Sequence, residues 1–419
     1  MSTLRQAVIL CGGLGTRLHP YTLDLPKPMI ATNGRPFLAY IVDQLAEQGI
    51  EKIILLTGYR GDQIEKYFGD GKTFGVAITY SQGPVEWETA KRIWEARASF
   101  ESQFLLMYSD NYIPISLAKL KAHHDASGKP LTVSLCKKDK GNIRVGASGV
   151  IEAYDSSRTL PGLDNVEVGY MVAERDRMLA AIKDPEKSFS NVLKALAASG
   201  ELAGFTLQDR YQSIGDAERW KKAESYLASK RLLLLDRDGT LNVKAQKARY
   251  ITAWSEFEWL PGVREALKKL AAAGFEFALI TNQAGIARGM INQDDLDEIH
   301  ARMSAALAAD GVKIRSIYVC PHHWDEKCAC RKPAPGMLLQ ASKDLNLRLD
   351  RTIYVGDDPR DCETADAATC MSAFVGPADE LAQLKTPPAL VGASLSAIVP
   401  EIIKTFEAWE TRDANGANV

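Results

Sequence analysis

The chain has 419 residues, more than one ordinary hydrophobic core holds, and the usual domain size of about 100 to 200 residues predicts two domains. Its 46% hydrophobic and 25% charged residues are typical of a folded globular protein and exclude a disordered or fibrous chain. Lys and Arg number 51 against 53 Asp and Glu, which excludes a bulk electrostatic attraction to nucleic acid or to an anionic membrane. We therefore expect small-molecule partners.

The first residues and the cysteines favour a cytoplasmic protein. Residues 1–10 enter a strand-like run without the basic and apolar regions of a secretory signal, and no segment approaches the ~18 apolar residues of a membrane helix. Three of the seven cysteines lie within residues 320–330, which suits a metal site in a reducing compartment better than a disulfide framework. The remaining cysteines are expected to be buried apolar side chains: Cys11, Cys136, Cys362 and Cys370.

The first half of the chain alternates strand-like and helix-like segments. Apolar runs at 7–10, 52–58 and 104–110 are followed by helical patterns at 36–48, 61–68 and 116–126. This alternation predicts a doubly wound α/β domain with a mainly parallel, Rossmann-like mixed sheet. Ligands bind beyond the carboxyl ends of the strands in such sheets, so we expect the chemistry in the loops that follow the strands.

A glycine-rich loop follows the first strand and precedes a Pro-Lys-Pro segment. Glycines let backbone N–H groups approach phosphates closely, and Arg17 and Lys27 can neutralise a triphosphate. A dinucleotide-binding motif is the main alternative, and it fits poorly because Pro26 and Pro28 would interrupt the helix that such a motif opens. The loop residues expected to contact phosphate are Gly12, Gly13, Gly15 and Thr16.

These segments, together with residues 34–59 and the motif MYSDN, resemble the sugar-1-phosphate nucleotidyltransferases, and in particular the D-glycero-D-manno-heptose 1-phosphate guanylyltransferases. Such enzymes join a nucleoside triphosphate to a sugar phosphate and release pyrophosphate. The resemblance implies that Arg17 and Lys27 are catalytic and that Asp110 binds Mg²⁺.

The expected sugar-binding segments depart from the family pattern. WETAKR stands at 87–92 in place of Leu-Gly-Thr-Ala-Gly; Arg158 and Glu167, which we expect to contact substrate, stand where relatives carry Glu-Lys and Asn-Ala-Gly. The second metal aspartate is Ser213 here, and Asp216 replaces it only if the loop folds differently. Either the acceptor differs from ordinary hexose phosphates, or this half binds nucleotide without catalysis.

No Pro/Gly/Ser-rich linker separates the two halves. Residues 216–230 have the pattern of a polar amphipathic helix, and Arg231 begins a new strand-like run. We predict a first domain over 1–230, a second over 231–408 and a flexible tail over 409–419.

The second half repeats the α/β alternation. Apolar runs at 232–236, 277–281, 316–320 and 352–357 predict a second doubly wound domain. Asp236 and Asp238 follow the first run, and their i, i+2 spacing sends both carboxylates to the same side. One carboxylate can attack phosphorus while the other handles the leaving-group proton. An acidic turn or a cation-binding loop is the alternative.

Polar side chains also stand at the ends of the other strands. Thr281 and Asn282 offer a hydroxyl and an amide to a phosphoryl group, Lys332 offers a cation, and Asp357 and Asp358 offer carboxylates to Mg²⁺. Taken singly, each has an ordinary explanation, such as a solvated lysine or a strand-end cap. Because the carboxyl ends of parallel strands share one edge of a sheet, we expect these side chains to converge around one phosphoryl group.

A Cys-x-His and Cys-x-Cys pattern lies within 320–330. Thiolates and an imidazole in this combination favour a closed tetrahedral Zn²⁺ site, although a metal-free cysteine-rich loop is the alternative. His322 is favoured as the imidazole ligand, and His323 stays open. The expected zinc ligands are Cys320, His322, Cys328 and Cys330. The ion would hold the loop that carries residues 331–332 into the site.

The motifs DRDGTLN, TNQAGIARG, CPHH…CACRKPAPGM and VGDDPRD resemble the haloacid dehalogenase superfamily, and within it the D,D-heptose 1,7-bisphosphate phosphatases, with histidinol-phosphate phosphatases as near relatives. The resemblance implies that Asp236 forms a phospho-aspartate, that Asp238 is the general acid/base, and that Thr281 and Lys332 bind phosphate. Mg²⁺ would be held by Asp236, the backbone carbonyl of Asp238, and Asp357. The implied substrate-binding residues are Asn282, Gln283, Arg288 and Arg331.

Heptose activation offers a reason for the fusion, because removal of the 7-phosphate from a 1,7-bisphosphate leaves the 1-phosphate that a nucleotidyltransferase caps. We therefore expect a bifunctional enzyme of nucleotide-sugar biosynthesis, with Mg²⁺ in both domains and structural Zn²⁺ in the second. GTP is the first choice of nucleotide, and the short loop between His322 and Cys328 leaves the sugar and its anomer open. The alternatives are a phosphatase for histidinol phosphate or another small phosphate, and a first domain that only senses nucleotide or forms a homo-oligomer.

Overall fold

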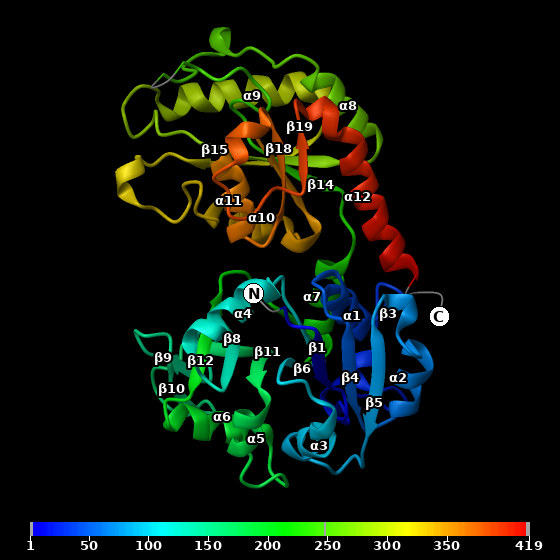
Figure 1. Ribbon diagram of the computed structural model, residues 1–419. Helices are drawn as coiled ribbons and strands as arrows, with labels where there is room; N and C mark the ends of the chain where they lie inside the picture. Colours follow the sequence, from blue (N-terminus) through cyan, green and yellow to red (C-terminus); the bar gives the residue numbers. More distant parts are fainter. Residues whose placement is uncertain (1–2, 247–248, 416–419) are drawn as a thin grey trace. The chain divides into compact units, whose positions relative to one another are not determined.

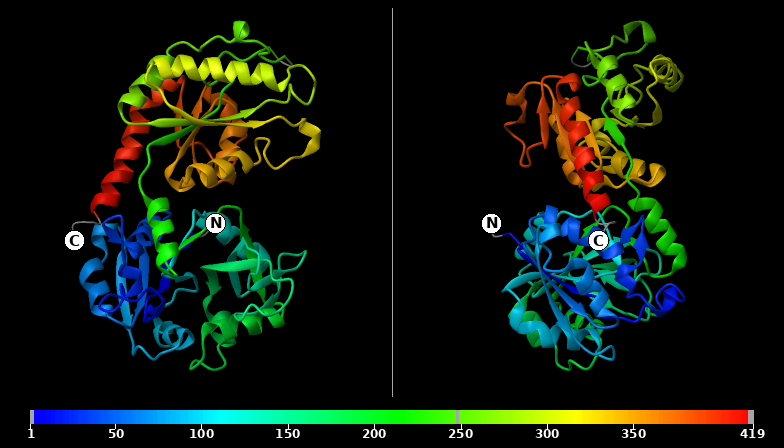
Figure 2. Two further views of the ribbon diagram at one scale, coloured as in Figure 1. Left: turned by 180° about the vertical axis from the view of Figure 1, so that it is seen from behind. Right: turned by 90° about the vertical axis from the view of Figure 1, so that its right-hand side faces the viewer.

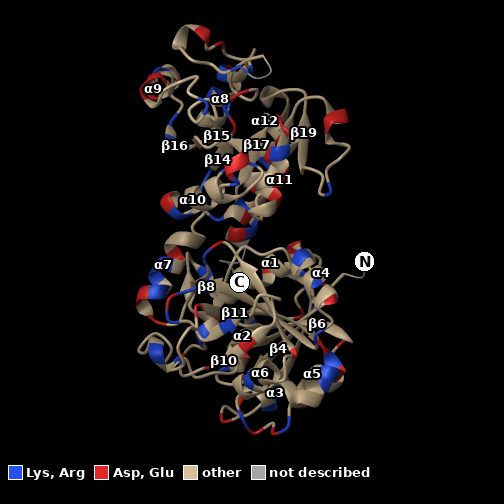
Figure 3. Cartoon of the chain, turned by 90° about the vertical axis from the view of Figure 1, so that its left-hand side faces the viewer, with Lys and Arg blue, Asp and Glu red and all other residues tan. Residues whose placement is uncertain are grey.

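The computed structural model describes residues 3–246 and 249–415. The chain forms two compact units, one over Met1–Leu227 together with Asp413–Val419 and one over Ala228–Arg412, and each has its own sheet and hydrophobic core (Figure 1). Among the described residues, no helix combines the length and the apolar character needed to cross a membrane. Figure 3 shows basic and acidic residues along the chain in both units.

A nine-stranded sheet forms the centre of the first unit. Its main path runs through β10 (Ile151–Tyr154), β9 (Ile143–Val145), β11 (Asn165–Glu174), β6 (Gln103–Tyr108), β1 (Gln6–Leu10), β4 (Lys52–Thr57) and β5 (Ala77–Gln82). Off this path, β8 (Leu131–Lys137) pairs with β11 and with β12 (Leu202–Leu207). The sheet is mixed, as expected, because β1 is parallel to β4 and β6 whereas β11 is antiparallel to β6 and β8.

Helices cover both faces of this sheet (Figure 2). Alternate residues of β1 enter two separate cores: Ala7 and Ile9 pack on one face, and Val8 and Leu10 on the other. A strand buried on both faces explains why its sequence is a continuous apolar run. The helices of this unit are α1 (Phe37–Glu47), α2 (Gly61–Phe68), α3 (Thr89–Ala96), α4 (Leu117–Ser127), α5 (Arg175–Ala181), α6 (Phe189–Ala198) and α7 (Ala217–Leu227).

Two pairs of very short strands complete the first unit. They are β2 (Ala31–Thr32) with β3 (Arg35–Pro36), and β7 (Asn111–Tyr112) with β13 (Gln212–Ser213). The second pair connects the loop after β6 to the segment that precedes α7, because Ser213 lies opposite Asn111 in its ladder.

The second unit contains a six-stranded parallel sheet. The strand order is β16 (Ile314–Cys320), β15 (Glu276–Asn282), β14 (Leu232–Leu235), β17 (Ile353–Gly356), β18 (Met371–Val375) and β19 (Leu390–Gly392). Its helices are α8 (Val263–Ala272), α9 (Gln293–Ala309), α10 (Gly336–Leu345), α11 (Pro359–Ala367) and α12 (Leu395–Asn415). The carboxyl ends of β14, β15 and β17 are therefore neighbours.

The tail predicted over 409–419 is helical in its described part, because α12 continues to Asn415. Trp409 packs edge-on against Phe406 with ring centroids 4.8 Å apart, and Glu410 accepts a 2.7 Å hydrogen bond from Arg231. These contacts hold the helix where the polar sequence suggested fraying. Residues 416–419 lie outside the described part of the chain.

Candidate active sites

A cavity of about 150 Å³ lies at the carboxyl ends of β14 and β15. Six predicted residues line it: Asp236, Asp238, Thr281, Asn282, Arg331 and Lys332. They come from the loop after β14, from the end of β15 and from the segment before α10. The structure thus brings together side chains that are almost 100 positions apart in the sequence, as the parallel-sheet argument requires.

The buried ammonium of Lys332 holds the centre of this site together. Its Nζ lies 2.7 Å from Asp236 Oδ1 and 2.7 Å from Asp361 Oδ1, and it donates a 3.0 Å hydrogen bond to the hydroxyl of Tyr354. Burial disfavours the charged ammonium, but the Asp236 and Asp361 carboxylates outweigh burial and raise the pKa of Lys332. An ammonium has three protons to donate, and these oxygens satisfy them.

Asp361 and Tyr354 are functional candidates that sequence reasoning missed. Tyr354 is fully buried in β17 and donates a 2.8 Å hydrogen bond to Asp361, which lies in the first turns of α11. The third carboxylate of the VGDDPRD motif was the available signal for Asp361. No pattern marked Tyr354, because a tyrosine in an apolar strand is ordinary core.

The carboxylates next to Lys332 form a site suited to a hard cation. Asp236, Asp357 and Asp361 offer oxygens that all lie within 4.8 Å of one another, and Asp357 Oδ1 is buried without a hydrogen-bond partner. Burial raises the pKa of Asp236 and outweighs the opposing charge of Lys332. The charges of Asp361 and Asp357 raise this pKa further, to about 7. Mg²⁺ prefers carboxylate oxygens, so this donor set fits Mg²⁺.

Asp238 has a different environment. It accepts hydrogen bonds from Arg237 Nη2 at 2.8 Å, Gln283 Nε2 at 2.8 Å and Asn242 Nδ2 at 3.0 Å. Burial alone would raise the pKa of Asp238, but the charge of Arg237 and these hydrogen bonds outweigh burial and lower it. Gln283 also donates a 2.8 Å hydrogen bond to Thr281 Oγ1, which ties the two strand ends together.

The predicted zinc ligands gather in one cluster. Cys320 Sγ lies 3.6 Å from Cys328 Sγ, and His322 Nδ1 lies 3.2 Å from Cys330 Sγ. All four donor atoms lie within 4.8 Å of one another, as a tetrahedral ion requires. His323 instead pairs with Asp325. The structure therefore favours His322 over His323.

Arg331 and Arg288 differ in their relation to the cavity. Arg331 lines it and also donates a 3.4 Å hydrogen bond to the carbonyl of His322, so the cysteine-rich loop and the cavity are directly connected. Arg288 does not line it. Its guanidinium lies 5.7 Å from the ring centre of Tyr250 and 5.4 Å from that of Trp324. Aromatic rings outside the cavity hold Arg288, and its contact with the substrate stays a prediction.

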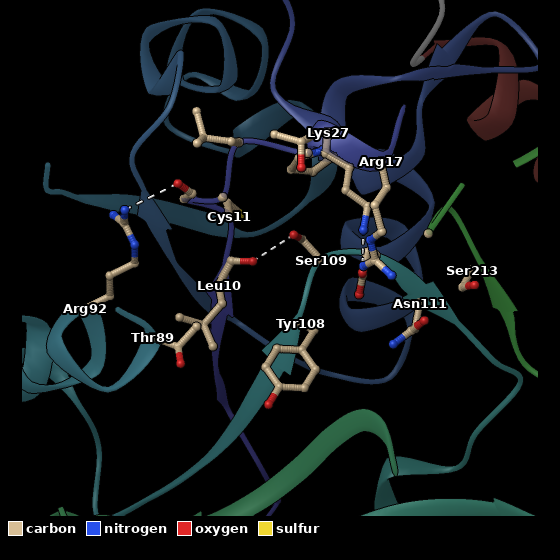
Figure 4. A pocket seen from close by; sticks show the side chains of 18 of the residues that line it. Leu10, Cys11, Arg17, Lys27, Thr89, Arg92, Tyr108, Ser109, Asn111 and Ser213 are labelled. Carbon is tan, nitrogen blue, oxygen red and sulfur yellow. Dashed lines mark hydrogen bonds and ion pairs between the residues drawn. The ribbon is translucent and has the colours of Figure 1, made fainter. Parts of the chain in front are cut away.

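A larger cavity, of about 700 Å³, lies in the first unit beyond the carboxyl ends of β1 and β6. Every residue predicted for this half lines it: Gly12, Gly13, Gly15, Thr16, Arg17, Lys27, Asp110, Arg158 and Glu167. Lys27 Nζ lies 2.6 Å from Asp110 Oδ2. Figure 4 shows Arg17 and Lys27 close together, apart from Thr89 and Arg92. Arg17 and Lys27 therefore place two cationic side chains on one side of the cavity.

Ser213 stands where the resemblance led us to expect a second metal aspartate. It lines the cavity, next to Asn111 in the ladder of β7 and β13. Asp216 does not line it and pairs instead with Arg219, whose Nε lies 3.2 Å from Asp216 Oδ2. The loop thus does not bring Asp216 into the place of the missing aspartate.

Glu167 faces the cavity beside Asp110. Burial and then the negative charge of Asp110 raise the pKa of Glu167 to about 7, against the lowering effects of a hydrogen bond from Tyr108 and of the charge on Arg158. Its Oε2 is buried without a hydrogen-bond partner. A carboxyl group near its midpoint at neutral pH can both donate to and accept from a sugar hydroxyl.

Arg92 was not predicted, and it fixes the walls of this cavity. Its guanidinium donates to the carbonyls of Thr57 and Pro84, each at 2.7 Å, and to the carbonyl of Gly12 at 3.3 Å. A Cβ at Gly12 would collide with this guanidinium, so a larger residue there would have to displace Arg92. Arg92, in the WETAKR segment, thus joins the glycine-rich loop to two other segments of the chain.

Comparisons with known proteins match the two halves of the chain to different families. Residues 6–160 match the family model "Nucleotidyl transferase", and residues 231–373 match "Polynucleotide kinase 3 phosphatase". The chain is 43% identical over 138 residues to D-glycero-beta-D-manno-heptose-1,7-bisphosphate 7-phosphatase of Pasteurella multocida, covering 32% of this chain and 73% of the relative. It is 40% identical over 150 residues to D-glycero-alpha-D-manno-heptose-1,7-bisphosphate 7-phosphatase of Mycobacterium tuberculosis, covering 34% of this chain and 78% of the relative.

Among solved structures, HddC from Yersinia pseudotuberculosis is 23% identical with a TM-score of 0.47, covering 54% of this chain and 100% of that one.

Proposed function

The C-terminal half of this chain belongs to the D-glycero-D-manno-heptose-1,7-bisphosphate 7-phosphatase family, and we propose that the whole chain is a bifunctional enzyme that makes a nucleotide-activated heptose. The chain is an enzyme in which a haloacid dehalogenase-type phosphatase follows a nucleotidyl transferase domain. In the proposed sequence, removal of the 7-phosphate of a heptose 1,7-bisphosphate leaves a 1-phosphate, which then takes a nucleotidyl group from an NTP. The Asp236–Lys332 pair, 2.7 Å apart in a polar cavity, is the observation that carries this proposal.

The phosphatase step begins at Asp236. Its carboxylate oxygen attacks phosphorus, the P–O bond to the sugar breaks, and a phospho-aspartate forms. Asp238 gives a proton to the departing sugar oxygen and later takes one from the water that attacks the phospho-aspartate and releases phosphate. Thr281 and Lys332 hold the phosphoryl oxygens and offset their charge.

Asp236, the backbone carbonyl of Asp238, and Asp357 would hold Mg²⁺. When bound, the ion supplies positive charge against the phosphoryl oxygens and the attacking carboxylate. The buried Asp357 Oδ1 without a hydrogen-bond partner supports this assignment, because an oxygen of this kind needs a cation or a donor.

A structural zinc ion is the second proposed metal. Cys320, His322, Cys328 and Cys330 supply a complete tetrahedral donor set, which leaves no open position for a reacting water. The hydrogen bond from Arg331 to the carbonyl of His322 supports an indirect role in which the cysteine-rich loop positions Arg331 for the substrate.

The nucleotidyltransferase step is assigned to the first unit. The glycine loop and Arg17 would bind the triphosphate, Lys27 would neutralise its charge, and Asp110 would hold Mg²⁺. Arg158 and Glu167 would bind the phosphate and a hydroxyl of the sugar. All of these groups line the 700 Å³ cavity, which supports their acting on one complex.

A second candidate function is a phosphatase whose first unit binds nucleotide without turnover. Ser213 and the ion pair of Asp216 with Arg219 favour it, because they leave Asp110 without a second aspartate in the cavity lining.

A substrate screen that measures phosphate and pyrophosphate separately tests these proposals. We expect phosphate from heptose 1,7-bisphosphate with a higher kcat/KM than from histidinol phosphate, and pyrophosphate from heptose 1-phosphate with at least one NTP. Nucleotide binding without pyrophosphate release from any NTP would select the second candidate. Preference for histidinol phosphate would contradict the heptose assignment.

A further inference from the structure

A second lysine, Lys244, lies against the proposed magnesium carboxylates. Its ammonium forms an ion pair with Asp357 Oδ2, and its side chain lines the same cavity as Asp236 and Lys332. The Asp357 side chain is only 13% exposed, whereas that of Lys244 is 46% exposed. Lys244 can therefore move without disturbing the core, whereas Asp357 cannot.

The backbone at Gly239 makes room for this ion pair. Gly239 has a φ of 94°, in the region that favours glycine, and a Cβ there would collide with the Asp357 carboxylate and with the Lys244 side chain. The DRDGT loop is thus shaped so that Lys244 reaches Asp357. This fit distinguishes the pair from a chance surface ion pair.

The two lysines of the cavity are held differently. Lys332 is 6% exposed and is bound to Asp236, Asp361 and Tyr354. Among the described residues, Lys244 is the one cation paired with Asp357. Lys332 is therefore a fixed part of the site, whereas Lys244 forms a single ion pair there, with Asp357.

We propose that Lys244 is a displaceable counter-ion, which a divalent cation must remove from Asp357 and which then binds a phosphate oxygen of the substrate. The inference rests on the proposed phosphatase function. Lys244 holds Asp357 Oδ2 and leaves Oδ1 for the cation, so two positive charges would lie on one carboxylate and repel each other, and Lys244 weakens cation binding in the substrate-free enzyme. Once displaced, its flexible stem keeps the charge at the cavity, where an entering phosphate attracts it. Cation binding and phosphate binding are thereby coupled through one side chain.

Calorimetric titration of the full-length chain with MgCl₂, with and without inorganic phosphate, tests this. In the absence of phosphate, we expect Lys244→Met to bind Mg²⁺ about tenfold more tightly than the wild type, because one competing ion pair is removed. At saturating Mg²⁺, we expect Lys244→Met to bind inorganic phosphate about tenfold more weakly. Lys244→Arg retains the charge and should keep phosphate affinity within a few-fold of the wild type.

Lys269→Met is the matched control. Lys269 is exposed in the last turn of α8, so its substitution changes the net charge equally and should leave both affinities unchanged. Unchanged or weaker Mg²⁺ binding by Lys244→Met would overturn the proposal, as would an equal effect of Lys269→Met. The titration requires no turnover, so this failure differs from failure of the proposed function, which would appear as a wild-type enzyme that binds Mg²⁺ but releases no phosphate.

Discussion

The ammonium of Lys332 lies 2.7 Å from Asp236 Oδ1, so the proposed nucleophile is held by a buried cation before any substrate enters. The same ammonium reaches Asp361 at 2.7 Å. One lysine thus joins the loop after β14 to the start of α11 and gives the carboxylate a fixed direction. Preorganisation of this kind lowers the cost of reaching the attacking geometry.

Replacement of this cation should affect both activity and stability. Lys332→Met leaves Asp236 and Asp361 buried without their counter-ion, so we expect phosphate release to fall by about 10²-fold or more and the C-terminal unit to lose about 3 kcal/mol of unfolding free energy. Steady-state kinetics and urea denaturation measure the two effects. Pyrophosphate release is the internal control. Wild-type phosphatase activity in this variant would contradict the role of Lys332.

His300 should make the stability of the C-terminal unit depend on pH. Burial and then the charge of Arg237, which lies 3.0 Å from His300 Nε2, lower the pKa of His300 to about 4. Between about pH 6.5 and about pH 4, His300 takes up a proton in the unfolded chain but not in the folded one. The free energy of unfolding therefore falls as the pH falls through this window, by about 3 kcal/mol in all.

The measurement compares wild type with His300→Gln, which cannot take up this proton. The stability advantage of the wild type should shrink by about 2 kcal/mol between pH 7.5 and pH 5. An advantage that is the same at both pH values would show that His300 titrates normally.

Zinc should be required for substrate binding rather than for the attack by the nucleophile Asp236. We expect elemental analysis to find about one Zn per chain in the wild type. Cys328→Ser should lose this ion, and its phosphatase KM should rise while its kcat changes less. Cys362→Ala is the matched control, because Cys362 is a buried free cysteine of the same unit outside the cluster. A chain without zinc, or equal zinc loss in both variants, would remove the site.

The first unit offers a paired test of its proposed metal ligand. Asp110→Asn removes the partner of Lys27 and should lower pyrophosphate release by about 10²-fold or more, with phosphate release unchanged. Asp216→Asn should have little effect, since Asp216 pairs with Arg219 and does not line the cavity. If both variants lost activity equally, Asp216 would have to enter the site during turnover.

Much of the phosphatase site could be predicted because apolar runs locate strand ends. Asp236, Thr281 and Asp357 follow such runs, and a parallel sheet brings them to one edge. The contacts of Tyr354 with Lys332 and of Lys244 with Asp357 could not be predicted. They depend on rotamers and on an irregular loop, neither of which has a sequence period.

The first unit shows a second limit of sequence reasoning. The pairing of Ser213 with Asn111 uses strands of two residues each, which are too short to show any alternation of apolar and polar side chains. Arg92 had the pattern of an ordinary helical arginine, and its four carbonyl partners belong to three separate segments, at Gly12, Thr57 and 84–85. The helical continuation over 411–415 depends on tertiary contacts that outweigh a polar composition.

The most direct test of the bifunctional assignment measures phosphate and pyrophosphate release by wild type and Asp236→Asn, each supplied with an active NTP and either heptose 1,7-bisphosphate or heptose 1-phosphate. The wild type should release both products from the bisphosphate. Asp236→Asn should release neither from the bisphosphate, because the 1-phosphate is not formed, but should release pyrophosphate from the 1-phosphate at the wild-type rate. Pyrophosphate release from the bisphosphate by Asp236→Asn, or its loss with the 1-phosphate, would contradict two independent sites acting in sequence.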